Sequence, residues 1–295
     1  MGIEVCLPSM DLKQIARSGQ CFRMEEQEDG AFRIIAGERC VKIVQLKAER
    51  EGCRFAFSCA EEEFHEFWRE YFDLGRDYGA IYRRIDPEDA YLCRAAKFGW
   101  GIHILKQDLW EMIITFIISQ QNNIPRIRRC VGLLCEKYGT KKRTAEGEEY
   151  FSFPRAKMLA GAKLEDLLAC NLGYRGKYIL KTAQMIAGGA FDLQALYYLP
   201  YEEAKKELMK LYGVGMKVAE CVCLFALHHV DAFPIDTHIM QILKRQYPEG
   251  FPFSRYQGIA GILQQYMFYY ELHGNKGCPV LSGDDGKTTK MNNHH

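Results

Sequence analysis

The hydrophobic pattern of the chain changes its period once, near Glu61, and this change limits the folds open to it. Before that point lie three short segments rich in Ile, Val and Phe and punctuated by Gly-Glu and Glu-Gly dipeptides: 32–36, 40–46 and 53–58. Such segments favour an antiparallel sheet with one face in solvent. After that point, apolar residues recur at helical spacing. The sequence therefore predicts an α+β protein, with an N-terminal antiparallel β-sheet domain followed by an all-α body.

Nine helices are predicted in the second part, and several begin at a side chain that can cap a helix, such as Asp108 or Asp236. Their expected ranges are 62–72, 87–98, 108–119, 124–138, 176–188, 201–211, 215–227, 237–246 and 255–272. The expected domains are a sheet domain with flanking helices at 1–97 and a helical domain at 98–275. Residues 276–295 are rich in Gly, Asp, Lys and Asn and are expected to form a disordered tail.

The composition argues against a membrane protein and points to one charged partner. The longest apolar run, 112–118, is far too short to cross a bilayer, and no signal peptide is expected. The 12 cysteines follow no regular spacing, which is typical of reduced cytosolic thiols. Residues 1–90 hold 13 Lys and Arg against 19 Asp and Glu, whereas residues 91–295 hold 26 against 19. This asymmetry predicts that one region faces a polyanion.

The segment LYGVGMKVAECVCL, from Leu211 to Leu224, is the most informative for chemistry. Gly213 and Gly215 allow a tight hairpin between a helix that ends near Leu211 and a helix that starts near Gly215. The first amides of the second helix have no intrahelical partner and can bind a phosphate. Because the two glycines have no side chains, a DNA backbone can approach closely. The segment therefore predicts a sequence-independent grip on DNA.

Two charged residues near this hairpin form a candidate catalytic pair. Lys217 lies in the first turn of the second helix, where the helix dipole disfavours an ammonium, and a neutral amine can attack a sugar carbon. Asp236 follows Pro234 at the start of another helix, where a carboxylate can stabilise positive charge on a deoxyribose ring. Taken singly, a surface lysine and an N-cap aspartate are ordinary. Together, after this hairpin, they predict a nucleophile and a catalytic carboxylate.

The hairpin and the segment FPIDTH at 233–238 resemble the helix-hairpin-helix, Gly/Pro-rich, aspartate motif of DNA glycosylases. Further matches between about residues 18 and 268 resemble the 8-oxoguanine DNA glycosylase family within it. The resemblance implies a sheet domain joined to a helical body and a bifunctional glycosylase and AP lyase that acts as a monomer on double-stranded DNA containing oxidised guanine. It implies no required cofactor and no metal, and it allows a monovalent cation at the hairpin.

The segment SGQCFR at 18–23 matches the family where a glycine carbonyl accepts the N7–H of the damaged base. Gly19 is the implied residue. Guanine has a lone pair at N7 where 8-oxoguanine has a hydrogen, so one carbonyl can distinguish the two. Met24 stands where the family often has Trp.

The segment GILQQYMF at 261–268 implies the rest of the base pocket. Gln264 and Phe268 are four residues apart and share one helix face, so Phe268 can stack on an extruded base while Gln264 reads its Watson–Crick edge. Cys221 is likewise four residues after Lys217 and is a candidate for the opposite wall. Without the resemblance, Phe268 and Cys221 would be assigned to the core.

The segment SQQNNIPR at 119–126 matches the family where an Asn and an Arg hold the orphaned opposite cytosine. Arg126 matches the Arg, and Asn122 is a further candidate for DNA contact. Gln121 occupies the Asn position, so selectivity for the opposite base is in question. By its composition alone, this polar cluster could also be a helix-capping loop.

The segment LGYRGKY at 172–178 implies Tyr174 as the wedge that fills the gap left by the flipped nucleotide, and Arg175 as a contact to the opposite base. An aromatic ring in the gap offsets lost stacking, on the order of a few kcal/mol. His238, two residues after Asp236, is assigned to DNA contact by the same resemblance.

Several alternatives are weighed against this interpretation. Endonuclease III-like relatives often carry four cysteines after the hairpin as ligands of an iron–sulfur cluster, but here only Cys278 follows Cys223. Alkyl-base glycosylases generally lack the lysine. A non-catalytic helix-hairpin-helix DNA-binding module and a glycosylase for another damaged base remain open, as does an unrelated α+β protein. The expected location is the cytoplasm, with the nucleoid, in a prokaryote and the nucleus in a eukaryote.

Overall fold

The computed structural model describes residues 2–49 and 52–274, and the predicted tail at 276–295 lies outside the described residues. The N-terminal part is a five-stranded antiparallel sheet with the strand order β1-β5-β4-β3-β2. Its strands are β1 Ile3–Leu7, β2 Met24–Glu26, β3 Phe32–Ala36, β4 Arg39–Glu49 and β5 Gly52–Phe57. The prediction of an antiparallel sheet domain is confirmed, and the three predicted strands correspond to β3, β4 and β5.

The sequence did not predict β1 and β2, and the reason differs between the two strands. β1 lies at the sheet edge, where its side chains alternate between half-buried and exposed, so its apolar signal is weak. β2 is only three residues long, with one buried side chain. Strands of this kind are stabilised by pairing with their neighbours, and the local sequence pattern does not predict that pairing.

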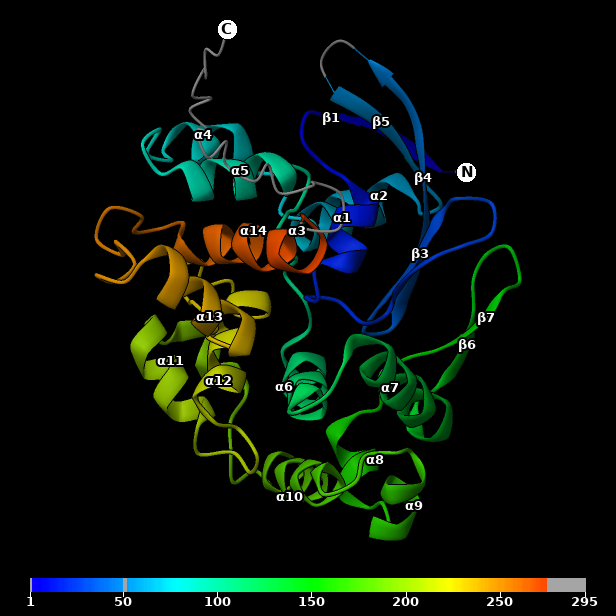
Figure 1. Ribbon diagram of the computed structural model, residues 1–295. Helices are drawn as coiled ribbons and strands as arrows, with labels where there is room; N and C mark the ends of the chain where they lie inside the picture. The colour runs from blue at the N-terminus through cyan, green and yellow to red at the C-terminus, as the bar shows by residue number, and fades with distance from the viewer. Residues whose placement is uncertain (1, 50–51, 275–295) are drawn as a thin grey trace, which may run out of the picture.

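Helices cover one face of this sheet and close a first core (Figure 1). Phe55 and Phe57 of the sheet share this core with Ile15 and Trp68. Trp68 belongs to a continuous helical stretch with a π-turn at its centre, which corresponds to the predicted helix at 62–72. The elements are α1 Leu12–Arg17, α2 Glu61–Glu63, η1 Phe64–Trp68 and α3 Arg69–Tyr71.

The rest of the described chain forms a helical body around α6, in which only Ser119 is not buried (Figure 1). The first half comprises α4 Tyr78–Arg83, α5 Ala90–Phe98, α6 Leu109–Ser119, α7 Ile124–Tyr138, a hairpin of β6 Lys141–Arg143 and β7 Glu149–Phe151, α8 Ala156–Ala160 and α9 Leu164–Ala169. The second half comprises α10 Arg175–Ala187, η2 Gln194–Tyr198, α11 Tyr201–Leu208, α12 Met216–Phe225, α13 Thr237–Gln246 and α14 Ala260–His273. No helix in the described ranges combines the length and apolarity needed to cross a membrane.

The predicted helix bounds hold where strong caps set them and shift elsewhere. α7 and α13 have the predicted ranges, with the side chains of Asn123 and Asp236 as their N-caps. The helix predicted from residue 255 begins only at Ala260, because turns occupy 253–259 and Gly258 has a φ of 81°. The helix predicted from residue 87 begins at Ala90, after a cap by Asp89. The short helices α1, α4, α8 and α9 were not predicted.

The described chain changes from one hydrophobic core to the other between Leu74 and Tyr78, and the expected domain boundary at residue 97 stays a prediction. Residues of α4 and α5 belong to the core of the helical body, and α5 packs against α14. The core beneath the sheet is formed by residues up to about Leu74. Among later residues of the described chain, it includes only Leu105, from the connecting segment 102–108. That segment runs in extended conformation between the two cores, so its side chains and backbone can bond to both.

His103 lies at the centre of this junction. Its side chain is 4% exposed and stacks on Tyr78 with ring centroids 4.0 Å apart. Its Nδ1 lies 3.0 Å from the carbonyl oxygen of Phe72 and its Nε2 lies 3.1 Å from the Ser9 hydroxyl. A carbonyl only accepts, so Nδ1 carries the hydrogen of the neutral ring and the Ser9 hydroxyl donates to Nε2. Burial lowers the pKa of His103 to about 4, although Asp73 opposes this shift.

We expect this histidine to make stability depend on pH. Its folded pKa lies below its ordinary value of 6.5, so the unfolded chain binds the proton first. The neutral histidine contributes fully to the free energy of unfolding above pH 6.5. This contribution, about 3 kcal/mol, is lost as the pH falls toward 4. Urea unfolding at pH 7 and pH 4 measures the difference in free energy of unfolding, which His103→Gln should reduce by about that amount. His65→Gln, at a half-exposed histidine, is the control, and equal pH dependence in all three proteins would refute the assignment.

Candidate active site

The helix-hairpin-helix lies where it was predicted, with α11 and α12 joined through a tight turn at 209–215. Gly213 has a φ of 77°, and a Cβ built on it would lie 2.7 Å from the Tyr178 ring, so only glycine fits. Nothing surrounds a Cβ built on Gly215, which is the exposed N-cap of α12. The first amides of α12 therefore start at an exposed residue, which is the geometry that the predicted phosphate contact needs.

Neighbouring elements fix the hairpin in place. The carbonyl oxygen of Gly213 accepts a hydrogen bond of 2.8 Å from Gln120 Nε2, and that of Tyr212 accepts one of 2.8 Å from Thr182 Oγ1. Gln120 follows α6 and Thr182 lies in α10, so two distant parts of the chain hold the turn. The hairpin is thus presented to solvent as a rigid unit.

Lys217 is half-buried in the first turn of α12, and α6 supplies its surroundings. Its Nζ lies 3.3 Å from Ser119 Oγ and 5.2 Å from the ring centroid of Phe116. Ser119 Oγ donates its own hydrogen to the carbonyl oxygen of Phe116 at 2.8 Å, so it accepts from the lysine. These contacts hold the amine at one position. Sequence reasoning did not identify Ser119 or Phe116, because both come from another helix.

Asp236 is the N-cap of α13, with Oδ1 accepting from the Ile239 amide at 2.9 Å. The expected cap is therefore present, and the carboxylate also lines the same pocket as Lys217. One oxygen is engaged by the helix. The second oxygen takes no part in this cap.

Glu220, which the sequence analysis missed, links Lys217's helix to the segment before Asp236. Its buried carboxylate accepts from Tyr201 Oη at 2.6 Å and from the Phe233 amide at 3.0 Å, and it pairs with Lys205 at 3.2 Å. Three elements therefore meet at one carboxylate. An acidic residue within an apolar helix was the available signal, because a buried charge needs partners.

One small pocket brings together the predicted catalytic and base-recognition residues. Its lining comprises Gly19, Lys217, Cys221, Asp236, Gln264 and Phe268, with Phe116, Phe225, Pro234 and Gln265. The pocket holds about 40 Å³, which is room for about three water molecules. Gln264 Nε2 donates to the Pro234 carbonyl at 2.9 Å, and Phe268 packs against Gly19. A base must therefore displace side chains to enter.

Cys221 forms an apolar wall of this pocket. It is 3% exposed, and burial raises the pKa of its thiol to about 11 despite the nearby Lys217. The thiol therefore stays protonated at neutral pH. A neutral, polarizable sulfur suits contact with the face of an aromatic base.

The expected contacts to the opposite base surround a turn outside the pocket. Gln121 is exposed with a φ of 46°, and Arg126 is exposed in the first turn of α7. Asn122 bonds to the Ile118 carbonyl at 3.0 Å. Arg175 was expected to reach the opposite base, but it is 4% exposed and its guanidinium donates to the carbonyls of Gln120 and Gln121. In this structure Arg175 therefore shapes the turn.

Two expected DNA contacts are open to solvent. Tyr174 is 46% exposed at the start of α10, with its ring centroid 5.7 Å from that of Tyr178. His238 is exposed in the first turn of α13, and its ring lies edge-on to Phe268 at 6.0 Å. His238 is therefore exposed to solvent on one side and contacts Phe268, a residue of the pocket lining, on the other.

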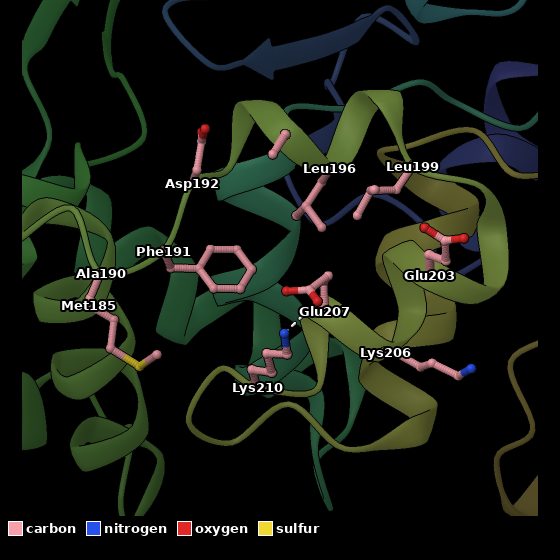
Figure 2. A pocket seen from close by; sticks show the side chains of 11 residues that line it. Met185, Ala190, Phe191, Asp192, Leu196, Leu199, Glu203, Lys206, Glu207 and Lys210 are labelled. Carbon is pink, nitrogen blue, oxygen red and sulfur yellow. Dashed lines mark hydrogen bonds and ion pairs between the residues drawn. The ribbon is translucent and has the colours of Figure 1, made fainter.

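A larger pocket, of about 510 Å³, lies away from these residues, between the end of α10, η2 and α11 (Figure 2). Phe191 and Leu196 line it, and an ion pair between Lys210 and Glu207 lies at its side. It contains none of the predicted site residues. The chemistry therefore favours the smaller pocket as the active site.

Comparison with known proteins shows the family to which this fold belongs. Residues 3–113 match the family described as 8-oxoguanine DNA glycosylase, N-terminal domain, and residues 114–249 match the HhH-GPD superfamily base excision DNA repair protein. The chain also resembles the solved 8-oxoguanine glycosylase/lyase of Clostridium acetobutylicum, bound to double-stranded DNA with cytosine opposite 8-oxoG. The identity is 34% over 93% of this chain and 98% of that one, with a TM-score of 0.83. The chain belongs to the 8-oxoguanine DNA glycosylase family.

Curated relatives of this chain include the N-glycosylase/DNA lyase of Saccharomyces cerevisiae, 40% identical over 50% of this chain and 42% of the yeast protein. A probable N-glycosylase/DNA lyase of Methanothermobacter thermautotrophicus is 28% identical over 88% of this chain and 92% of its own length. The chain thus spans less than half of the yeast relative and nearly all of the archaeal one. A 3-methyladenine glycosylase of Archaeoglobus fulgidus, 20% identical with a TM-score of 0.72, shares the fold.

Proposed function

We propose that this protein excises 8-oxoguanine from duplex DNA and then cleaves the strand through a lysine Schiff base. The observation that carries the proposal is that Lys217 and Asp236 line the same pocket as Gly19 and Phe268. A nucleophile, a carboxylate, a carbonyl acceptor and a stacking ring thereby meet within one site. A plain DNA clamp needs none of them.

Binding begins at the hairpin, where the amides near Gly215 take a phosphate. Tyr174 enters the gap left by the flipped nucleotide. The extruded base displaces Phe268 and stacks between it and Cys221, while the Gly19 carbonyl accepts the N7–H. Gln264 exchanges its bond to Pro234 for one to the edge of the base. Arg126, with Gln121 and Asn122, lies on the side of the opposite base, on the turn that Arg175 holds from within.

The reaction uses groups of this chain alone. The Lys217 amine, after losing one proton, attacks C1′, and the glycosidic bond breaks with its electron pair leaving on the base, which takes up a proton. Asp236 stabilises the positive charge on the sugar during this step. Ring opening gives the Schiff base, and loss of a C2′ proton then expels the 3′ phosphate. The strand is thereby cut on the 3′ side of the lesion.

No cofactor takes part in these steps. A monovalent cation at the hairpin stays a prediction, since the carbonyl oxygens of Tyr212 and Gly213 each accept one hydrogen bond and keep a second lone pair. The proposed enzyme works as a monomer. Its place is beside the DNA, in the cytoplasm of a prokaryotic cell or the nucleus of a eukaryotic one.

The test uses duplexes with one 8-oxoguanine opposite each of the four bases, incubated with the protein and sodium borohydride. We expect a covalent adduct, most abundant opposite cytosine. Gln121→Asn should increase the preference for cytosine several-fold, about 1 kcal/mol, because a shorter amide matches the family pattern. The amounts of adduct on a gel measure both the reaction opposite each base and the preference for cytosine. Unaltered preference in Gln121→Asn would refute the role of Gln121.

The same assay separates the other functions. A second candidate is an alkyl-base glycosylase, since a DNA-3-methyladenine glycosylase of Bacillus subtilis is 26% identical over 62% of this chain. Release of 3-methyladenine without an adduct on 8-oxoguanine DNA would favour it. DNA binding with neither base release nor adduct would favour a non-catalytic clamp.

A further inference from the structure

Gly19 is held between two fully buried polar residues that bond to each other across it. Gln20 Nε2 donates to Ser18 Oγ at 2.9 Å, and Ser18 Oγ donates to the Ile15 carbonyl at 2.8 Å. Both side chains are 0% exposed. Gly19 itself has a φ of 77°, and a Cβ on it would lie 3.1 Å from Phe268. The bridge from Ser18 to Gln20 therefore constrains the backbone at Gly19, which lines the base pocket.

Gln20 attaches this bridge to the segment between the two cores. Its Nε2 also donates to the His103 carbonyl at 2.9 Å, and its Oε1 accepts from the Leu105 amide at 2.8 Å. Both amide hydrogens and the carbonyl oxygen of the side chain are thus used. An amide buried in this way has one favourable orientation, because any other leaves polar groups unpaired.

Gln107 extends the connection to the helix that carries the nucleophile. Its Nε2 donates to the Gln20 carbonyl at 2.8 Å, and its backbone amide donates to the Phe225 carbonyl at 2.8 Å. Phe225 is the last residue of α12 and lines the pocket. Two hydrogen bonds therefore connect α12 through Gln107 to the backbone of Gln20, the residue covalently next to Gly19.

We propose that Gln20 and Gln107 are positioning residues that set the Gly19 carbonyl relative to α12 and thereby determine recognition of the oxidised base. The inference rests on the proposed function of Gly19 as acceptor of the N7–H. Gly19 belongs to the sheet domain and Lys217 to the helical body, so their relative position depends on the junction between the two cores. A hydrogen bond weakens steeply with misalignment, so a small shift of this carbonyl is sufficient to lower discrimination.

The experiment compares two reactions of Gln107→Met, which removes one side-chain bond, and of Gln20→Met, which removes three. Single-turnover excision of 8-oxoguanine opposite cytosine needs Gly19, whereas borohydride trapping on abasic DNA needs Lys217 but no base. We expect excision to fall about 10- to 100-fold in each variant relative to abasic trapping, as small misplacements in active sites do. Ser152→Ala, at a buried serine that accepts from the Thr140 amide, controls for general destabilisation.

The outcomes are distinct. A parallel fall of excision and abasic trapping would reduce the two glutamines to structural residues, and unchanged excision would overturn the inference directly. If Gln20→Met does not fold, Gln107→Met decides, since it leaves the bonds from Gln20 to Ser18, His103 and Leu105 intact. A wild-type protein that traps abasic DNA but leaves 8-oxoguanine in place would overturn the proposed function, and the inference with it.

Discussion

Lys217→Gln is expected to abolish the borohydride-trapped adduct and to lower 8-oxoguanine excision by at least about 1,000-fold, because it removes the amine that forms the covalent bond. Glutamine keeps a polar group near Ser119 Oγ but has no nucleophilic lone pair. Lys217 is half-buried and bonds to a single hydroxyl, so the fold should keep its stability. Single-turnover excision, adduct formation and thermal unfolding measure the three quantities.

Lys210→Gln is the matched control. Lys210 belongs to the same hairpin and its side chain is 62% exposed, but it pairs with Glu207 outside the active-site pocket. It should keep adduct formation while losing the same formal charge. If Lys217→Gln still forms the adduct, the nucleophile lies elsewhere. If both variants lose adduct formation and DNA binding equally, Lys217 contributes only positive charge for binding DNA.

Asp236→Asn is expected to lower excision by about 100- to 1,000-fold while leaving the melting temperature almost unchanged. Asparagine caps helices as well as aspartate does, so the bond to the Ile239 amide and the start of α13 are retained. What is lost is the negative charge beside the sugar. The variant therefore separates the two roles of this residue, and single-turnover kinetics with thermal unfolding reads both.

Asp77→Asn provides the comparison for capping. Asp77 caps α4 through the Ala80 amide at 2.9 Å and lies outside the pocket. Asp77→Asn should keep the excision activity and the melting temperature of the wild-type protein. A large drop in the melting temperature of Asp236→Asn, with activity lost in proportion to the folded fraction, would leave Asp236 as a cap only.

The fold class followed from the sequence because it depends on local periodicity. α7 and α13 were predicted to the residue, since Asn123 with Pro125 and Asp236 mark their starts. The short helices α1, α8 and α9 were not, because helices of five or six residues are stable only through the packing they make in the folded protein.

The candidate site residues also fall into those that local sequence predicted and those that it did not. The hairpin glycines, Lys217 and Asp236 lie close in sequence, and their chemistry could be argued from spacing and helix starts. Gly19 and Phe268 were assigned to the pocket by family resemblance, because they lie near opposite ends of the described chain. The structure places both in one lining with the lysine.

The sequence by itself determined the order of sheet and helices, the position of the helix-hairpin-helix and the choice of Lys217 and Asp236 as the candidate reactive side chains, since each is encoded within one or two turns of chain. Only the tertiary structure decided which groups hold them. Ser119 reaches Lys217 across 98 residues and Gln107 reaches Gln20 across 87. Buried polar groups take whichever partner the packed fold presents, and neither periodicity nor spacing specifies that partner.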